Sequence, residues 1–266
     1  MPGPKLLGLL FFLTLTKVLQ AGPDRGRTGP GKEGTYTRTP DGVIVYPDMH
    51  WSGNTAAVKL SVVAENIIRV LSSPVKGEAD RKSLITVYKV DPSVKWDMTH
   101  DEEKVVLHTR LLTATVIIAT GAVHFTDAAG QPILAEKGSG GRSFDAAVFD
   151  GAPSYHIRQT FAATPDEAFY GLGQHQDGLV NYKGHQVSLF QNNTEVAIPF
   201  LLSSRNYGIL WDNYSLTTVG DIRPYKQLSA LRLYSAHGEQ GWLTAYYHND
   251  KLHPEVVALE KAESLI

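Results

Sequence analysis

Short apolar stretches, separated by turn-forming residues, recur along the chain and predict β-strands. The first, Val43–Tyr46, is bounded by a glycine and a proline. Two longer stretches, Ala57–Ala64 and Ile67–Leu71, flank the dipeptide Glu65-Asn66. Two strand-like runs joined by a two-residue connection of this kind are typical of a β-hairpin. This part of the sequence therefore predicts antiparallel strands joined by tight turns.

The same pattern continues through the middle of the chain. Leu111–Ala119 is rich in β-branched residues, which favour strands, and the sequence Asp127–Gly130 predicts a turn. In Tyr155–Phe161 apolar and polar residues alternate, as in a strand with one face in solvent. Further strand candidates are Gln186–Phe190, Ile198–Leu202, Gly208–Trp211, Leu216–Val219, Leu231–Tyr234 and Trp242–Tyr247.

Many short strands with Gly, Asn and Asp turns predict an all-β protein, an antiparallel β-sandwich that occupies residues 35–250. Helical character is confined to the end of the chain. In Pro254–Ile266 a proline precedes an acidic residue and spaced apolar positions, which predicts the start of a helix. We interpret residues 251–266 as the beginning of a linker or of a following domain.

The N-terminus has the pattern of a secretory signal. Lys5 precedes the apolar run Leu6–Leu15, which is too short to span a bilayer, and Ala21 is a small residue at a plausible cleavage point. Residues 1–21 are therefore predicted to be a cleaved signal peptide, which places the protein in the periplasm or outside the cell without a membrane span. Residues 22–34, rich in Gly, Pro and charge, are expected to form a flexible leader.

Composition limits the classes of function. The 266 residues include 25 Lys and Arg and 27 Asp and Glu, with no basic stripe, which argues against nucleic acid as a partner. There is no cysteine, and none of the 10 histidines has metal-ligand spacing. We expect neither a metal nor a cofactor. Glycosidic chemistry needs two carboxyls, but no spacing pairs Asp177, Asp212 and Glu195, which we expect in turns or on the surface.

Four motifs give the most informative signal, and they occur in a fixed order. They are Phe169–Gln174 (FYGLGQ), Asn192-Asn193, Ile198–Phe200 (IPF) and Tyr207–Leu210 (YGIL). In order and spacing this series resembles the end of the N-terminal, galactose mutarotase-like β-supersandwich of family 31 glycoside hydrolases, and it is most similar to that of bacterial α-xylosidases. The resemblance covers roughly residues 34–247.

The resemblance implies a function. In this family the sandwich precedes a catalytic (β/α)8 barrel that carries two catalytic aspartates, so this chain is expected to hold no catalytic residue and to be inactive alone. In the family an acidic residue of the loop that corresponds to residues 191–194 contacts sugar at the barrel mouth. In this chain Asn193 takes that position, so an amide replaces the carboxylate. The expected substrate-binding residues are Gln174, His175, Asp177, Asn192 and Asn193. The expected partners are an oligosaccharide with α-xylosyl or α-glucosyl units and the barrel of the same polypeptide.

Several alternatives stay open from the residues. Asn193 could instead be an Asx-turn residue without contact to sugar. The chain could be a free-standing carbohydrate-binding sandwich, or its parent enzyme an α-glucosidase of the same family. An aldose epimerase would need a histidine acid and a glutamate base, for which His156 and Glu195 are the formal candidates. The four tryptophans are expected to pack in the core or at strand edges.

Overall fold

The computed structural model describes residues 32–77, 83–87, 91–138 and 141–220, together with the backbone of three strands near the ends of the chain. These three strands are Leu7–Leu13, Trp242–Tyr247 and Val256–Ala262. The chain divides into two compact units, residues 1–221 and 222–266. The described residues form strands and no helix, which confirms the predicted all-β class.

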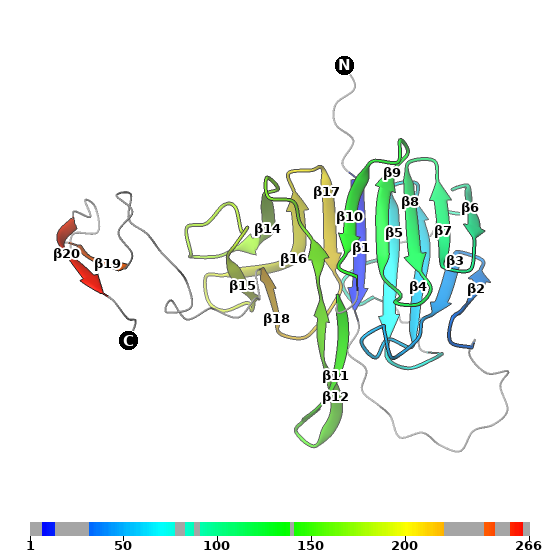
Figure 1. Cartoon of the computed structure of the whole chain (residues 1–266), viewed down its shortest axis with the longest axis horizontal. Helices are drawn as coiled ribbons and strands as arrows, with labels where there is room; N and C mark the ends of the chain where they lie inside the picture. The colour runs from blue at the N-terminus through cyan, green and yellow to red at the C-terminus, as the bar shows by residue number, and fades with distance from the viewer. Residues whose placement is uncertain are drawn as a thin grey trace. The chain divides into compact units, whose positions relative to one another are not determined.

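Two large sheets form most of the first unit (Figure 1). In spatial order, the eight-stranded sheet contains β14 (Phe169–Gln174), β16 (Val196–Ser203), β17 (Tyr207–Trp211), β1 (Leu7–Leu13), β5 (Ile67–Ser73), β4 (Ala57–Ala64), β3 (Gly42–Tyr46) and β2 (Thr35–Thr39). The six-stranded sheet contains β13 (Phe161–Ala162), β10 (Pro132–Glu136), β9 (Val123–Asp127), β8 (Leu112–Ile117), β7 (Lys104–Thr109) and β6 (Trp96–His100).

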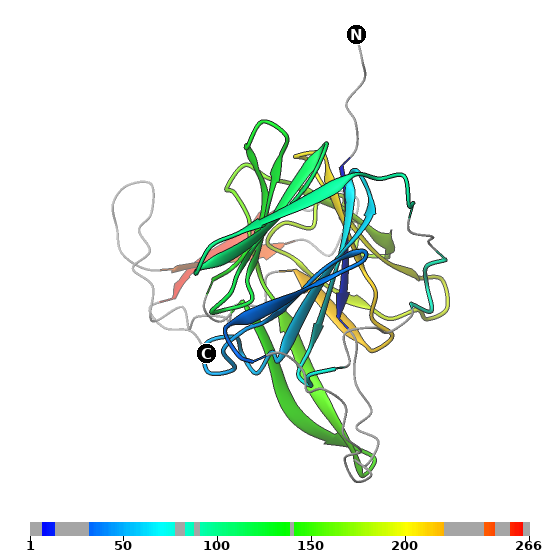
Figure 2. The same cartoon turned by 90° about the vertical axis from the view of Figure 1, so that its right-hand side faces the viewer.

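The core lies between these two sheets, which Figure 2 shows from the side. Alternate residues of each strand point into it, because successive side chains of a strand face opposite sides of the sheet. The eight-stranded sheet contributes residues such as Leu60, Ile68 and Val70, and the six-stranded sheet contributes Leu107 and Phe125. The predicted antiparallel sandwich is therefore confirmed.

The predicted turns form where the sequence places them. Glu65-Asn66 closes the hairpin between β4 and β5. The carboxylate of Asp127 accepts hydrogen bonds from the backbone N–H groups of Ala129 (2.9 Å) and Gln131 (2.8 Å) between β9 and β10. Gly130 completes this turn with a φ of 77°, which glycine adopts without strain.

Two smaller pairs of strands belong to the same unit. β11 (Arg142–Phe149) and β12 (Ala152–Gln159) form a long hairpin that projects from the sandwich (Figure 1). β12 alternates between exposed and partly buried residues as predicted. β15 (Gln186–Leu189) and β18 (Thr217–Gly220) form the second pair.

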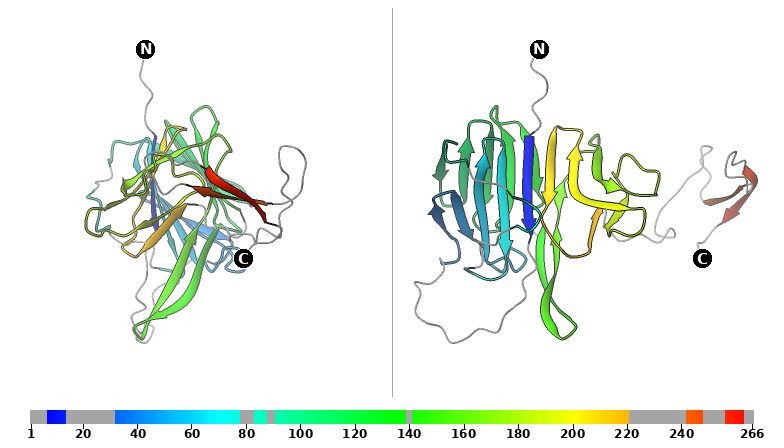
Figure 3. Two further views of the ribbon diagram at one scale, coloured as in Figure 1. Left: turned by 90° about the vertical axis from the view of Figure 1, so that its left-hand side faces the viewer. Right: turned by 180° about the vertical axis from the view of Figure 1, so that it is seen from behind.

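Strand β1 is the one parallel member among the described strands of the eight-stranded sheet. Figure 3 shows it in blue between β5 and β17. It pairs in parallel with both neighbours, whereas the other described pairings of this sheet are antiparallel. The residues of β1 belong to the segment that the sequence predicts to be a signal peptide, and that prediction remains untested.

The second unit contains β19 (Trp242–Tyr247) and β20 (Val256–Ala262), paired antiparallel. The helix predicted to start at Pro254 is wrong, because Val256–Ala262 is a strand. Val256 and Val257 are β-branched, and pairing with the aromatic-rich strand β19 outweighs the weak helical pattern. Residues 22–31 of the predicted leader (22–34) and the strand candidate Leu231–Tyr234 lie outside the described residues.

Candidate functional site

Strand β14 bends sharply at its two glycines. Gly171 (φ 96°) and Gly173 (φ 108°) lie on either side of a register irregularity in the pairing of β14 with β16. A Cβ atom on Gly173 would lie 1.8 Å from the carbonyl oxygen of Val196, and one on Gly171 would lie 2.4 Å from that of Phe200. Only glycine fits at these positions. The bend buries Leu172 and leads the chain out to Gln174 at the surface.

The end of β14 meets the turn that precedes β16. Gln174 pairs in register with Val196, which follows shortly after Asn193. The side-chain amide of Gln176 donates a hydrogen bond to the hydroxyl of Thr194 and so joins the two loops. The predicted residues Gln174 and Asn193 therefore lie at the same end of the β14–β16 pair, although they are 19 positions apart in sequence.

The loop after Gln174 is held in place from within. His175 Nε2 lies 2.9 Å from the carbonyl oxygen of Leu172, and the His175 ring packs edge-on against Tyr182. Asp177 accepts a hydrogen bond from the backbone N–H of Leu179 (2.9 Å), which makes an Asx turn. Beneath the loop, Leu172, Tyr182 and Val187 form a small apolar cluster.

Asn192 and Asn193 occupy an exposed turn. The carbonyl oxygen of Asn192 accepts a hydrogen bond from the N–H of Glu195 (3.0 Å), and Asn193 has a φ of 49°. Asparagine tolerates this left-handed conformation better than most residues. Within the described part of the chain neither side-chain amide makes a hydrogen bond, so the alternative of a side-chain Asx turn at Asn193 is not observed.

The resulting surface is suited to binding hydroxyl groups. An amide side chain both donates and accepts hydrogen bonds, and the carboxylate of Asp177 accepts them. Gln174, Asp177, Asn192 and Asn193 are exposed, while His175 is half-buried. No hydrogen bond links the side chains of these five residues to one another. The structure thus gathers polar groups on two joined loops without forming a reactive pair.

Sequence reasoning missed the contact that joins these loops. Gln176 and Thr194 are separated by 18 positions, and neither belongs to a pattern that predicts their contact. It also missed the role of Tyr182, whose position beneath His175 depends on the path of the loop. The only available signal was that Gln176 and Thr194 lie inside the two polar segments that flank the motif residues.

A buried hydrogen-bond cluster supports the strands behind the loops. One carboxylate oxygen of Glu167 accepts hydrogen bonds from the hydroxyls of Ser203 on β16 and Tyr207 on β17, both at 2.5 Å. The other accepts one from the backbone N–H of Thr164 (3.2 Å). Burial, together with the hydrogen bond to Glu167 and its charge, raises the pKa of Tyr207, so its hydroxyl stays protonated and keeps donating.

The three carboxylates that the sequence could not pair occupy different settings in the structure. Asp177 and Glu195 lie in turns, as expected. The expectation for Asp212 is wrong, because this residue has 0% of its surface exposed. The epimerase pair gains no support: the ring of His156 packs on Phe149 in the projecting hairpin, whereas Glu195 precedes β16.

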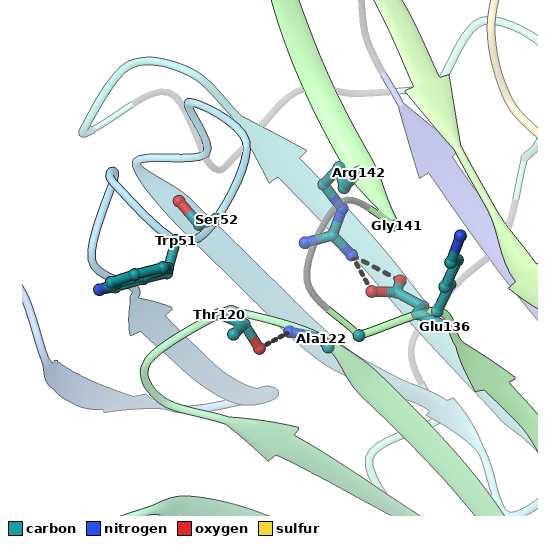
Figure 4. Close-up of a pocket in the computed structure, with 9 residues that line it drawn as sticks. Trp51, Ser52, Thr120, Ala122, Glu136, Gly141 and Arg142 are labelled. Carbon is teal, nitrogen blue, oxygen red and sulfur yellow. Dashed lines mark hydrogen bonds and ion pairs between the residues drawn. The ribbon is translucent and has the colours of Figure 1, made fainter.

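A small pocket lies at a different place, between the β10–β11 connection and the loop that carries Trp51 (Figure 4). It is bordered by an ion pair between Arg142 and Glu136, whose side chains are 4% and 1% exposed. Arg142 also donates to the carbonyl oxygen of Gly121 (3.2 Å) and to the side chain of Gln159 (2.9 Å), and Glu136 accepts from the N–H of Val123 (3.1 Å). All these groups are satisfied internally, which indicates a structural role.

The tryptophans follow the expectation only in part. Trp96 and Trp211 pack against the main core. Trp51 does not, since it is 55% exposed beside the pocket. The side chain of Trp242 lies outside the described residues.

The described residues offer no metal site and no membrane-spanning helix. Among them no three His, Cys, Asp or Glu side chains are grouped so that they could hold a metal ion. In the same residues no helix has the length and apolar character needed to cross a bilayer.

Comparison with known proteins identifies relatives of this fold and motif series. Residues 57–219 match the family model of the glycosyl hydrolase 31 N-terminal galactose mutarotase-like domain. The chain is 30% identical over 172 residues to an α-xylosidase of Saccharolobus solfataricus, an alignment that covers 61% of this chain and 23% of the relative.

Solved structures give the same result. A family 31 α-xylosidase from Xanthomonas citri superposes with a TM-score of 0.63 at 39% identity. The superposition covers 85% of this chain and 24% of the α-xylosidase chain. A family 31 α-xylosidase from a soil metagenome, complexed with xylose, superposes with a TM-score of 0.57 at 22% identity, with coverage of 70% and 29%, and supports the fold alone. The chain thus spans about a quarter of the length of these relatives.

Proposed function

Since the chain belongs to glycoside hydrolase family 31 and contains its N-terminal galactose mutarotase-like domain, we propose that it is the non-catalytic N-terminal part of an α-xylosidase. In this proposal the (β/α)8 barrel of the same polypeptide cleaves the glycosidic bond, and the domain contributes the joined loops at Gln174–Asp177 and Asn192–Thr194 to the mouth of the active site. The substrate is an oligosaccharide with non-reducing α-xylosyl units.

The observation that carries this proposal is the joined loop surface on a rigid support. β14 and β16 fix where the two loops begin, the Gln176–Thr194 hydrogen bond joins them, and the amides of Asn192 and Asn193 remain without partners among the described residues. Side chains that are held in position but not bonded within their own domain are available to an external ligand. The similarity to α-xylosidases supports xylose as the sugar.

Exposed apolar side chains are frequent in the part of the chain that contains these loops, and they support packing against a second domain. Six of the thirteen large apolar side chains that are exposed among the described residues lie between positions 180 and 216: Val180, Phe190, Val196, Ile198, Tyr214 and Leu216. Exposed apolar side chains that gather into a patch are typical of an interface.

We also propose that residues 1–21 are a secretory leader and that the mature domain functions in the periplasm or outside the cell. The support is the order of Lys5, the apolar run and Ala21 in the sequence. N-terminal sequencing of the exported protein tests this proposal: Gly22 at the N-terminus is the expected result, and Met1 or Pro2 would refute it.

The role of Asn193 can be tested in an active enzyme. We expect a chimera of the Xanthomonas citri α-xylosidase, with residues 35–220 in place of its own domain, to hydrolyse an aryl α-xyloside. Replacing Asn193 with glycine should lower kcat/KM roughly 3–10-fold, the effect of losing one hydrogen bond to the sugar. Glycine keeps the backbone at a positive φ, so the change removes the amide without straining the turn.

The matched control is Asn206→Gly. Asn206 is also exposed and also has a positive φ (64°), but it follows the far end of β16, roughly 24 Å along the strand. This variant should leave kcat/KM unchanged. Equal effects of the two substitutions would mean that Asn193 has no specific role at the active-site mouth.

A free-standing carbohydrate-binding protein is the alternative, and the unbonded amides of Asn192 and Asn193 are the observation that favours it. Calorimetric titration of the purified chain with a xyloglucan oligosaccharide separates the two functions. Binding by the chain alone that is lost in Asn193→Gly would support the alternative.

A further inference from the structure

Strand β1 connects the two halves of the eight-stranded sheet. On one side Leu7–Phe11 pair with Tyr207–Trp211 of β17, and on the other Leu10–Leu13 pair with Arg69–Ser72 of β5. Within this sheet β14, β16 and β17 are therefore linked to β5, β4, β3 and β2 through β1 (Figure 3). The strands that carry the candidate sugar-binding loops depend on whatever occupies this position.

The occupant in this structure is an apolar segment from the proposed leader. The seven residues of β1, Leu-Gly-Leu-Leu-Phe-Phe-Leu, contain no polar side chain. They lie inside the run that is expected to be removed with residues 1–21. Cleavage would leave β5 and β17 as two facing edges with unpaired backbone groups, and such edges bind further strands readily.

Two buried polar residues border β1 at the same end. Ser72 pairs in register with Leu13, and Asp212 follows Trp211, the partner of Phe11. Both are completely buried. Among the described residues the hydroxyl of Ser72 makes no hydrogen bond, and neither carboxylate oxygen of Asp212 makes one with good geometry, although the hydroxyls of Ser83 and Tyr214 lie nearby. An apolar strand cannot supply side-chain donors to them, and buried polar atoms without partners are costly.

The alternation of the strands assigns each of these residues to one face of the sheet. Ser72 shares the core-facing side with Ile68 and Val70, so it lies beside position 13 of the occupant on that face. Asp212 follows the core-packed Trp211 and therefore lies on the opposite face, beside position 12. Burial raises the pKa of Asp212, and this effect is partly offset by the nearby hydroxyls of Ser83 and Tyr214 and the charge of Arg69.

We propose that the position between β5 and β17 is a docking slot for an extended strand from the rest of the glycoside hydrolase polypeptide, and that this strand places side-chain hydrogen-bond donors beside Asp212 and Ser72. Leu7–Leu13 holds the slot only in the precursor. The proposal rests on the proposed removal of the leader. The relatives are about four times as long as the region they share with this chain, so most of their polypeptide lies outside this domain.

The consequence is a structural link between the two parts of the enzyme. A strand inserted from the remaining polypeptide would complete the sheet, join β17 to β5 and thereby fix β16 and the turn at Asn193. The sugar-binding loops would then reach their final position only when the rest of the chain has docked.

The chemical preference of the slot can be measured in the complete chain, residues 1–266, expressed without export so that β1 is retained. Phe12→Gln places a donor beside Asp212. The change in melting temperature caused by Phe12→Gln is measured twice, once with Asp212 present and once in the Asp212→Leu variant. We expect this change to be about 2–4 °C more favourable when Asp212 is present. Phe11→Gln, on the opposite face, is the control and should show no such coupling. Equal shifts in both backgrounds would overturn the proposal.

The vacancy itself can be tested by amide hydrogen exchange on residues 22–266. Relative to residues 1–266, exchange should be at least tenfold faster at the amides of Arg69–Ser72 and Tyr207–Trp211, while Leu112–Ile117 in β8 should be unaffected. A lysine-flanked peptide of residues 7–13 with Phe12→Gln should restore protection, and it should bind roughly tenfold more tightly than the same peptide with Phe11→Gln.

Unchanged protection in residues 22–266 would mean that β5 and β17 close on each other, and the proposal would be wrong. If residues 22–266 do not fold, the coupling between positions 12 and 212 in the complete chain still decides the matter. N-terminal sequencing of the exported protein tests the leader separately from the slot, so a failure of one is not mistaken for a failure of the other.

Discussion

Replacing Arg142 with methionine is expected to destabilise the folded sandwich by about 3–5 kcal/mol at pH 7, because it leaves the buried carboxylate of Glu136 without its counter-charge. The pair is almost completely enclosed, so solvent cannot replace the lost partner. The free energy of unfolding, obtained from urea denaturation of the purified chain, measures this effect.

The same variant should show a characteristic dependence on pH. Burial raises the pKa of Glu136 above its ordinary value of 4.5, and the charge of Arg142 acts in the opposite direction. Without Arg142 the pKa rises further. When the pKa of a carboxyl is higher in the folded state than in the unfolded state, the free energy of unfolding decreases as the pH rises through the folded-state pKa. The destabilisation by Arg142→Met should therefore be smaller at pH 5 than at pH 8.

Two controls isolate the buried charge. Arg110→Met removes the partner of Glu65 from an exposed ion pair and should change stability little, since such pairs contribute little in water. The double variant Arg142→Met with Glu136→Leu removes both charges and should recover much of the loss. If Arg142→Met were no more harmful than Arg110→Met, the buried pair would have no special role in stability.

Replacing Gly173 with alanine is the second substitution with a large expected effect, about 3–5 kcal/mol of destabilisation. Two costs add. The backbone at Gly173 has a φ of 108°, which side chains rarely adopt, and the new Cβ would lie 1.8 Å from the carbonyl oxygen of Val196. Because that oxygen belongs to the neighbouring strand, β16 would have to move.

Gly178→Ala is the matched control for this prediction. Gly178 also has a positive φ (70°), but a Cβ there would meet nothing within 4 Å, so only the conformational cost of about 1–2 kcal/mol remains. Thermal unfolding of the two variants gives the comparison. Equal destabilisation would show that β16 adjusts freely, and that the bend does not position the turn at Asn193.

The sequence predicted the parts of this fold that depend on local patterns. Glu65-Asn66 and Asp127–Gly130 form their turns because the flanking strands and the turn residues agree on one structure. The motif Phe169–Gln174, which carries the family resemblance, contains the bend of β14, and its two glycines have the backbone freedom that the bend requires. These features need only a few neighbouring residues to be read.

What the sequence did not predict depends on partners that are distant along the chain. The Gln176–Thr194 contact forms because β14 and β16 bring two loops together. In the sequence Asp212 looks like a turn residue, but in the structure it is buried. A distant segment covers this part of the chain: the N–H of Leu84 donates a hydrogen bond to the hydroxyl of Tyr214 (2.7 Å). Val256–Ala262 becomes a strand because β19 is available to pair with it. Local patterns contain none of these partners.

The most direct test of the proposed function is hydrolysis of an aryl α-xyloside by the purified chain, with the Xanthomonas citri chimera as the positive control. The account predicts no turnover by the chain alone and activity in the chimera, because catalysis belongs to the barrel. Turnover by the chain that a single carboxylate substitution, such as Asp177→Asn, abolishes would contradict the account and make this domain an enzyme in its own right.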